Sequence, residues 1–484
     1  MKRRELITLL SGAASAFTAS PHGARRNALG TRDDKMNAMQ SHNKQSRYEM
    51  RSALTIAGLL ALGMGAAAPT ARADVALPPF YEAVTKMSPD GKLGQVVKRE
   101  KVTTSIAGAQ AWRIAYISSD AQERMTLSTA LVVAPVGSAP KEGRPVIAWA
   151  HGTTGTAQSC GPSQMLDPAK SLNQYFLVGG DSWSDYGLPS VEAFIKEGYV
   201  VVGTDYQGLG GGGRHQYSVA VTNGRDVINS VRAAGSMKET GGGRKAVVYG
   251  WSQGGGATLG AASLIDYIAR KGTALDGVEF LGFVAMAPDD IAAVAPREKL
   301  TEATAETMFG QLVTTFSDNV FNFTHFAMFA WATQAAFPNL QLTDIFTDDG
   351  AKAIDEVMSK KCMHAAADTM NYTFGVDYKA LVRRVSKNAL AWADAFIRGS
   401  VVSVKPAAPV VIYWGTKDTV VPPAMGQAYR EQMCQLGGNV ARVQLEGEQT
   451  HFSTPVKAVP LYVAWIKDRV AGKPIADGCK GRSD

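Results

Sequence analysis

Most of this chain lacks an excess of positive or negative charge. Residues 1–73 contain eleven Lys or Arg against four Asp or Glu, and they account for the whole net charge of +7. The residues that follow contain 39 charges of each sign. Because nucleic-acid binding depends on a basic surface that neutralises phosphates, this balance argues against a nucleic-acid partner.

Long apolar runs are also few, and the one near the N-terminus is short. It covers 53–68, follows Arg51 and ends before Ala71-Arg72-Ala73. Its 16 residues are fewer than the roughly 20 that span a bilayer. A basic start, an apolar run and an A-x-A end are typical of a signal peptide. We therefore predict that 1–73 is a targeting segment cleaved before Asp74. The mature protein would be secreted or periplasmic, without stable membrane insertion.

Cysteine is scarce, and the four cysteines stand far apart. They are Cys160, Cys362, Cys434 and Cys479. Structural zinc sites need ligands in pairs at short spacing, so this distribution predicts no metal site. An even number of cysteines in an exported protein predicts two disulfides, and the count alone leaves three pairings open.

The chain after residue 74 has no internal repeat and no low-complexity linker. Short alternating or β-branched runs predict strands, and helical patterns lie between most of the later ones. The predicted strands are 95–102, 111–118, 126–133, 144–150, 199–203, 245–249, 280–286, 409–414 and 440–445. This alternation predicts one α/β domain over 74–484 with a mostly parallel, doubly wound sheet.

Residues 291–395 interrupt that alternation. They are rich in helix-forming and aromatic residues and lack the pattern of a buried strand. We therefore predict a helical lid inserted into the domain. Seven large apolar residues crowd into 321–337. They predict either the core of the lid or a wall that binds an acyl chain.

The hexapeptide at 250–255, Gly-Trp-Ser-Gln-Gly-Gly, carries the strongest signal. An apolar strand pattern precedes it, and small residues that predict a helix follow at 256–269. A strand, a Gly-x-Ser-x-Gly turn and a helix form a nucleophile elbow, where strained backbone leaves room only for glycine beside the serine. Ser252 is the predicted nucleophile. The N–H of Gln253 is a predicted oxyanion donor, since it lies at the start of the helix.

A serine nucleophile needs a base and a carboxylate that orients the base, in the chain order Ser, acid, His in this fold. Three histidines follow Ser252, and only His451 lies just after the last strand, because His325 and His364 fall in the lid. Asp418 follows the strand at 409–414 and is the predicted acid. The alternatives to it are Asp289, Asp290, Glu446 and Glu448.

The loop at 151–155 supplies the second predicted oxyanion donor, the N–H of Gly155 or of Thr154. His151 precedes this loop and is assigned a structural role. The glycine-rich run at 208–213 has no Lys-Ser/Thr after it, so it is not a phosphate loop. Chemistry of the Ser-His-Asp type requires no metal and no organic cofactor.

Five segments taken together resemble the secretory lipase family, the fungal lipase A type of α/β-hydrolase. They are 151–153 with Cys160 soon after, 203–210, 250–255, 415–418 and 450–451. The likeness covers about residues 78–479, and the glycine-rich loop at 210–213 departs from the family pattern. The resemblance implies a secreted lipase or carboxylesterase with a helical lid before the acid strand. It also implies the pairing Cys160–Cys362 and Cys434–Cys479.

These motifs predict hydrolysis of carboxylic esters through an acyl-serine intermediate. The expected substrates are acylglycerols or other lipophilic esters, with transient contact with a lipid interface. A serine peptidase of the prolyl-oligopeptidase type and an acyltransferase are alternatives, although too few residues precede the sheet for the propeller of such peptidases. A non-catalytic binding protein on this fold is a further alternative, against which the complete and correctly ordered set of Ser, Asp and His argues.

Overall fold

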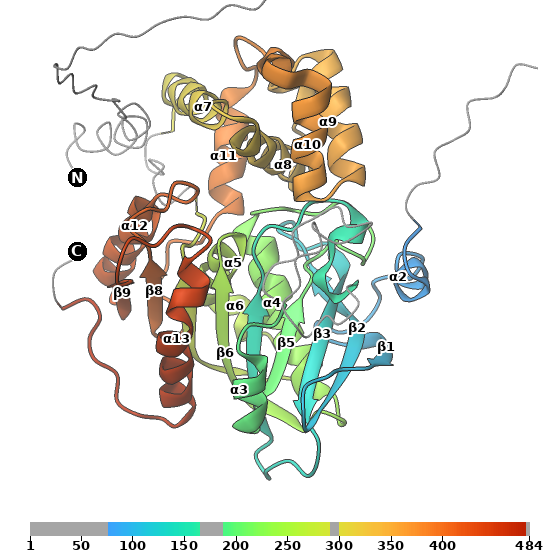
Figure 1. Ribbon diagram of the computed structural model, residues 1–484, viewed down its shortest axis with the longest axis vertical. Coiled ribbons are helices and arrows are strands. Elements are labelled where there is room, and N and C mark those ends of the chain that lie inside the picture. The colour runs from blue at the N-terminus through green and yellow to red at the C-terminus, as the bar shows by residue number, and fades with distance from the viewer. Residues whose placement is uncertain (1–75, 165–186, 291–299, 481–484) are drawn as a thin grey trace, which may run out of the picture.

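A twisted sheet with helices on both faces forms the body of the protein, and a helical cap covers one end of it (Figure 1). The computed structural model describes residues 76–164, 187–290 and 300–480. The predicted targeting segment, its cleavage site before Asp74 and the first residues of the predicted lid, 291–299, lie outside the described residues.

The described residues form one sheet of nine strands in the order β1-β2-β3-β5-β4-β6-β7-β8-β9. The neighbouring pairs β1–β2, β2–β3 and β3–β5 are antiparallel. The remaining neighbouring pairs, from β5–β4 to β8–β9, are parallel. This arrangement confirms the predicted α/β architecture with its mostly parallel sheet. The strands are β1 Val96–Val102, β2 Ala109–Ser119, β3 Met125–Pro135, β4 Arg144–Ala150, β5 Val200–Thr204, β6 Gly242–Trp251, β7 Glu279–Met286, β8 Val410–Trp414 and β9 Val440–Gln444.

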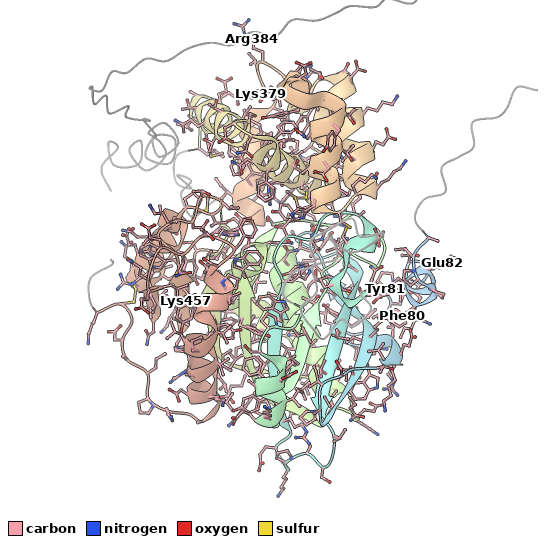
Figure 2. The ribbon with its side chains drawn as sticks, in the orientation of Figure 1. Phe80, Tyr81, Glu82, Lys379, Arg384 and Lys457 are labelled. Atoms are coloured by element: carbon pink, nitrogen blue, oxygen red, sulfur yellow. A yellow bond between two sulfur atoms is a disulfide. The ribbon has the colours of Figure 1, made fainter. Side chains whose placement is uncertain are left out.

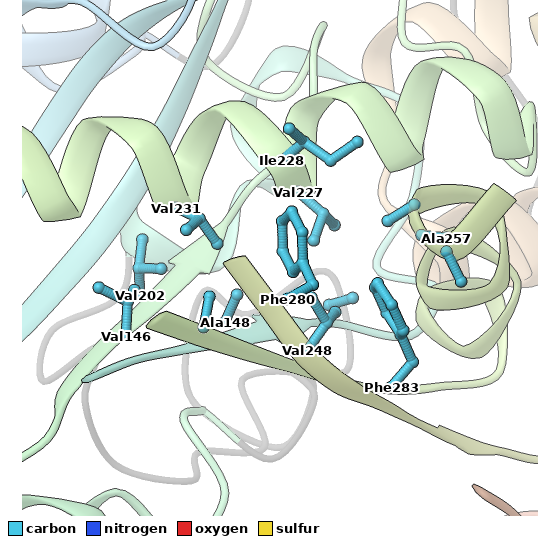
Figure 3. Close-up of a cluster of buried hydrophobic side chains, with 14 of the residues drawn as sticks. Val146, Ala148, Val202, Val227, Ile228, Val231, Val248, Ala257, Phe280 and Phe283 are labelled. Carbon is cyan, nitrogen blue, oxygen red and sulfur yellow. The ribbon is translucent and has the colours of Figure 1, made fainter. Parts of the chain in front are cut away.

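The central strands are apolar along their whole length because helices bury both of their faces. Within β4, Val146 and Ala148 face one hydrophobic cluster while Ile147 and Trp149 face another. Helices α4, α5 and α12 cover the first face, and α3 and α13 cover the second. Figure 3 shows Val227 and Ile228 of α4 and Ala257 of α5 beside strand residues of the first face. Each fully buried Val or Ile side chain stabilises this sheet by about 1.5–3 kcal/mol.

The helices of this body are α2 Pro79–Val84, α3 Val191–Lys196, α4 Ala220–Ser236, α5 Gln253–Ser263, α6 Ile265–Ile268, α12 Pro423–Gln435 and α13 Thr454–Val470. The prediction of a single helix over 256–269 is wrong at one point, because the structure has two helices, α5 and α6, separated at Leu264. There the carbonyl of Ala262 accepts the backbone N–H of Ala407 at 2.8 Å, so a distant segment takes the bond that would continue the helix.

The cap consists of five α-helices within the described residues between β7 and β8. They are α7 Glu302–Phe316, α8 Val320–Ala336, α9 Asp348–Lys360, α10 Met363–Phe374 and α11 Ala389–Gly399. Their aromatic and aliphatic side chains form a second hydrophobic cluster, which includes Phe326 and Trp392 and which Tyr217 and Val219 of the body join. Charged residues such as Lys379 and Arg384 lie at the end of the cap farthest from the sheet (Figure 2).

Two disulfides are present among the described residues, and they join the pairs that the family resemblance implied. Cys160–Cys362 connects the loop after β4 to the cap, just before α10. Cys434–Cys479 connects α12 to the C-terminal segment. None of the helices within the described ranges has the length and apolar character needed to cross a membrane.

Candidate active site

The backbone at Ser252 adopts the strained turn that the sequence predicted. Ser252 has φ 57° and ψ −122° between the end of β6 and the first residue of α5. Glycine is needed on both sides because a Cβ at Gly250 would overlap the carbonyl oxygen of Gly254, and one at Gly254 would overlap that of Ala150. The turn is held by a bond of 3.0 Å from the Ser252 N–H to the carbonyl of Met286. The serine side chain is thereby fixed at the carboxyl edge of the sheet.

Ser252, His451 and Asp418 form a continuous chain of hydrogen bonds. His451 Nε2 lies 2.9 Å from Ser252 Oγ, and His451 Nδ1 lies 2.8 Å from Asp418 Oδ2. All three residues are buried. A carboxylate can only accept, so Nδ1 carries the proton and Nε2 is free to accept the hydroxyl proton of serine. This is the geometry of a base oriented for removal of that proton.

The loops that carry Asp418 and His451 support one another. The second carboxylate oxygen of Asp418 accepts the backbone N–H groups of Val420 and Val421 at 3.0 and 2.9 Å, which fixes the carboxylate orientation. The Lys417 N–H donates to the carbonyl of Gln449 at 2.9 Å and ties the two loops together. The Trp251 indole N–H donates to the carbonyl of His451 at 3.1 Å. Residues from three strand ends are therefore held in one rigid unit.

The alternative acids have other partners. Asp289 accepts the Ser218 hydroxyl at 2.8 Å, and the side chain of Asp290 accepts that of Ser400. Glu446 pairs with Lys457 at 3.3 Å, and Glu448 pairs with Lys417 at 3.4 Å. The carboxylate bonded to His451 is that of Asp418.

His151 has the surroundings expected of a structural histidine. Its ring is buried, and Nδ1 lies 2.5 Å from the carbonyl of Gly152. Burial lowers the pKa of His151 to about 4, so the ring is neutral at neutral pH. It also stacks near Tyr206, whose hydroxyl donates to the carbonyl of His151 at 3.0 Å. These contacts hold the start of the 151–155 loop.

The loop residue beside Ser252 is Thr153, which the sequence reasoning did not single out. Thr153 lines a cavity together with Ser252 and His451. The two predicted donors, Thr154 and Gly155, line neither cavity at Ser252 and instead join the cap. The Thr154 carbonyl accepts the Met363 N–H at 2.9 Å, and Gly155 pairs with Cys362 in an antiparallel bridge. Its position directly after His151-Gly152, where the chain leaves β4, could have identified Thr153 as a site residue from the sequence.

Beneath the predicted oxyanion donor lies a layer of buried polar side chains. The side-chain amide of Gln253 lies 3.2 Å from His215 Nε2 and 3.3 Å from Asn223 Oδ1. His215 Nδ1 donates to the carbonyl of Gln207 at 2.7 Å, which leaves Nε2 as an acceptor. Burial lowers the pKa of His215 to about 3 and keeps it neutral. These two bonds fix the side chain of Gln253, whose backbone N–H directly follows Ser252 in the chain.

Two cavities meet at Ser252, and the cap forms part of the wall of each. The first, which we call the Asp289 cavity, has about 570 Å³ of empty space, including the part open to solvent. Its lining is Tyr217, Ser252, Asp289, Leu312, Phe316, Asn322, His325, Phe326, Phe329, Val420, Val421 and Met425. The second, the His451 cavity, has about 420 Å³ of empty space by the same measure. Its lining is Thr153, Trp251, Ser252, Phe321, His325, Met363, His364, Val420, His451 and Phe452.

The histidines of the predicted lid are thus part of the cavity walls. His325 Nδ1 lies 3.0 Å from the carbonyl of Phe321, one turn earlier in α8, and lines both cavities. Burial lowers the pKa of His325 to about 4 and also lowers that of His364. Burial raises the pKa of Asp289 above its ordinary value. These shifts reduce the charge exposed to a bound substrate, which suits a neutral, apolar molecule.

Solved structures with a similar fold include a lipase and an esterase. Candida antarctica lipase A in its closed state superposes with a TM-score of 0.60 at 18% identity, covering 83% of this chain and 88% of that one. The rice cell wall degrading esterase LipA of Xanthomonas oryzae gives 0.56 at 17% identity, covering 79% and 100%. At these identities the likeness shows the α/β-hydrolase fold.

Sequence relatives are named as lipases. Lipase 5 of Candida albicans is 23% identical over 417 residues, which cover 83% of this chain and 82% of that protein. A secreted triacylglycerol lipase of Malassezia globosa is 24% identical over 349 residues, covering 67% of this chain and 64% of that protein. The model of the secretory lipase family matches residues 184–478, which is more than half of the chain and includes Ser252, Asp418 and His451. This chain therefore belongs to the secretory lipase family and is a carboxylic ester hydrolase with the α/β-hydrolase fold.

Proposed function

We propose that this protein is an exported serine esterase or lipase that hydrolyses lipophilic carboxylic esters, acylglycerols among them, through an acyl-Ser252 intermediate. The observation that carries the proposal is the chain of hydrogen bonds from Asp418 through His451 to Ser252, with distances of 2.8 and 2.9 Å. The apolar cavities on both sides of Ser252 favour an ester with an apolar part on each side of its carbonyl.

Acylation begins with attack of Ser252 Oγ on the ester carbonyl carbon while His451 Nε2 takes the hydroxyl proton. Asp418 stabilises the imidazolium that forms. The negative charge that develops on the carbonyl oxygen would be met by the N–H of Gln253 and by that of Thr153. The tetrahedral intermediate then collapses, and the alcohol leaves with the proton returned by His451.

Deacylation repeats the same steps with water as the nucleophile. His451 removes a proton from a water molecule, which attacks the carbonyl carbon of the acyl-serine. Collapse of the second intermediate breaks the bond to Ser252 Oγ, and His451 returns the proton to that oxygen. The carboxylic acid is released, and the enzyme is regenerated without any other reactant.

Export and contact with lipid complete the proposal. The signal-like pattern before Asp74 and the family match both support export. Phe452 is 37% exposed and lines the His451 cavity. Val456 is 60% exposed and lies in the first turn of α13. These exposed apolar side chains, one at the edge of the substrate cavity and one on the helix that follows, would contact a lipid surface transiently, without inserting into it.

The test is a comparison of Ser252→Ala with the wild type on ethyl hexanoate. We expect a loss of about 10³-fold or more, because alanine at this position cannot form the acyl intermediate. A fluorophosphonate probe should label the wild type at Ser252 and leave the variant unlabelled. Ser236→Ala, at the far end of α4, is the control and should keep wild-type turnover.

Two results would contradict the proposal. Full ester hydrolysis by Ser252→Ala would exclude the acyl-serine mechanism. Cleavage of aminoacyl nitroanilides by the wild type without cleavage of esters would identify a peptidase instead.

A further inference from the structure

The two cavities at Ser252 are not equivalent in the reaction. His451 must return its proton to the oxygen of the departing alcohol, so the alcohol has to lie beside His451. His451 lines only one of the two cavities, the one of about 420 Å³. The His451 cavity is therefore the side for the alcohol, and the Asp289 cavity is the side for the acyl chain.

The wall of the His451 cavity is composed mainly of flat rings. Three of them come from different elements: Trp251 from the elbow, Phe321 from α8 of the cap and Phe452 from the loop before α13. Ring centroids lie 6.0 Å apart for Trp251 and Phe452 and 6.5 Å apart for Phe321 and Phe452. The imidazoles of His325 and His364 lie 4.5 and 6.5 Å from the ring of Phe321.

The acyl side has a different lining. It also contains rings, those of Tyr217, Phe316, Phe326 and Phe329, but Leu312, Val421 and Met425 add aliphatic surface there and Asp289 adds a carboxyl group. Aliphatic surface accommodates a chain in many orientations. Aromatic rings instead favour offset or edge-to-face contact with another ring, which adds to the hydrophobic gain from burial.

We propose that the His451 cavity selects esters whose alcohol part carries a flat aromatic ring, such as benzyl-type esters. The ring of the alcohol would lie among Trp251, Phe321 and Phe452 while the alcohol oxygen faces His451. This inference depends on the proposed hydrolysis at Ser252 and adds to it the chemical class of the leaving group.

The experiment compares benzyl hexanoate with cyclohexylmethyl hexanoate. The two esters share the acyl chain, carry the same number of carbon atoms in the alcohol and release similar alcohols, so they differ mainly in whether the ring is flat. Their rates in alkali correct for the remaining difference in reactivity. We expect kcat/KM of the wild type to favour the benzyl ester about tenfold, the gain from two or three ring contacts.

Two variants locate the preference in the cavity. Phe321→Leu and Phe452→Leu, each at a partly exposed position, should each lower the benzyl preference about threefold, since each removes one ring contact. Phe316→Leu is the matched control, because Phe316 lines only the Asp289 cavity, and the preference should stay at its wild-type value.

The outcomes separate this inference from the proposed function. If the wild type hydrolyses ethyl hexanoate but treats the benzyl and cyclohexylmethyl esters alike, the inference is wrong and ester hydrolysis stands. A benzyl preference that survives both Phe→Leu changes would also overturn it. Failure to hydrolyse any of the three esters would refute the ester hydrolase and the inference together.

Discussion

The sheet body and the cap contribute different residues to the site. The body supplies all three residues of the Ser252–His451–Asp418 chain, and each follows a parallel strand. The cap supplies no member of that chain but contributes Phe316, Phe321 and other residues to the cavity walls. The cap therefore shares the cavity walls with the body, but the three hydrogen-bonded residues all belong to the body.

The reason for this division is the tolerance of each region to change. A parallel strand end is fixed by hydrogen bonds to its neighbours, so a side chain there keeps its position to a fraction of an ångström. Gly250 and Gly254 have no room for any side chain. A cap helix with its own core can change the residues on its inner face without disturbing the sheet. Chemistry therefore constrains the body, and the cap is free to adapt the substrate range.

The largest expected effect comes from replacing one histidine of the body and one of the cap by alanine and comparing the two losses of activity. His451→Ala should lower kcat for ethyl hexanoate about 10⁴-fold, because it removes the base. His325→Ala changes only a cavity wall of the cap and should alter kcat/KM by less than about tenfold. Circular dichroism would confirm that both variants are folded. A larger loss from His325→Ala than from His451→Ala would contradict the division.

The two disulfides sharpen the comparison, because one joins the cap to the body and the other lies within the body. Their sequence separations are 202 and 45 residues. Chain entropy predicts that Ala at both cysteines costs about 5 kcal/mol of unfolding free energy for Cys160–Cys362 and about 4 kcal/mol for Cys434–Cys479, as upper values. Thermal unfolding of the two double variants measures this loss.

Ester hydrolysis by the same variants should separate them further. Cys362 directly precedes Met363 and His364, which line the His451 cavity. Removal of Cys160–Cys362 should therefore lower kcat/KM, while removal of Cys434–Cys479 should leave it unchanged below the unfolding temperature. Equal activity of the two variants would show that the cap keeps its position without its covalent link.

The smallest expected effect concerns the pH dependence of stability in the body. Burial lowers the pKa of folded His215 to about 3 from the ordinary 6.5. The unfolded chain then binds more protons below pH 6.5, so this residue contributes stability above that pH and loses it as the pH falls towards 3. Between pH 7 and 4.5 we expect a loss of about 2–3 kcal/mol from His215 alone.

Urea unfolding of the wild type and of His215→Asn at pH 7 and 4.5 tests this loss. The variant should be less stable at pH 7, and the gap between the two proteins should narrow at pH 4.5. Burial raises the pKa values of Asp205 and Asp226 to about 6, and these act in the opposite direction. Both proteins contain them, so their effect cancels in the comparison. A gap that widens on acidification would contradict the neutral state of His215.

Sequence patterns located the body better than the cap. Strands such as β4 and β8 are short apolar runs that end in polar loops, so their pattern is visible without the fold. No helix was predicted at α2, although proline fits the first turn of a helix and Pro79 stands there. The cap was predicted only as a helical segment. Its helix α8 is apolar on nearly every side, so no periodic pattern indicated which face would line a cavity.

By itself, the sequence determined the order of the three residues that the structure joins by hydrogen bonds. Gly-x-Ser-x-Gly after a strand, Asp418 after β8 and His451 after β9 are local signals, because each depends on where one strand ends. The tertiary structure alone decided that Thr153, not Thr154 or Gly155, lies at the cavity, since the latter two are joined to a cap segment about 200 residues away. It also decided which rings line the His451 cavity, because packing between distant segments leaves no periodic trace in the chain.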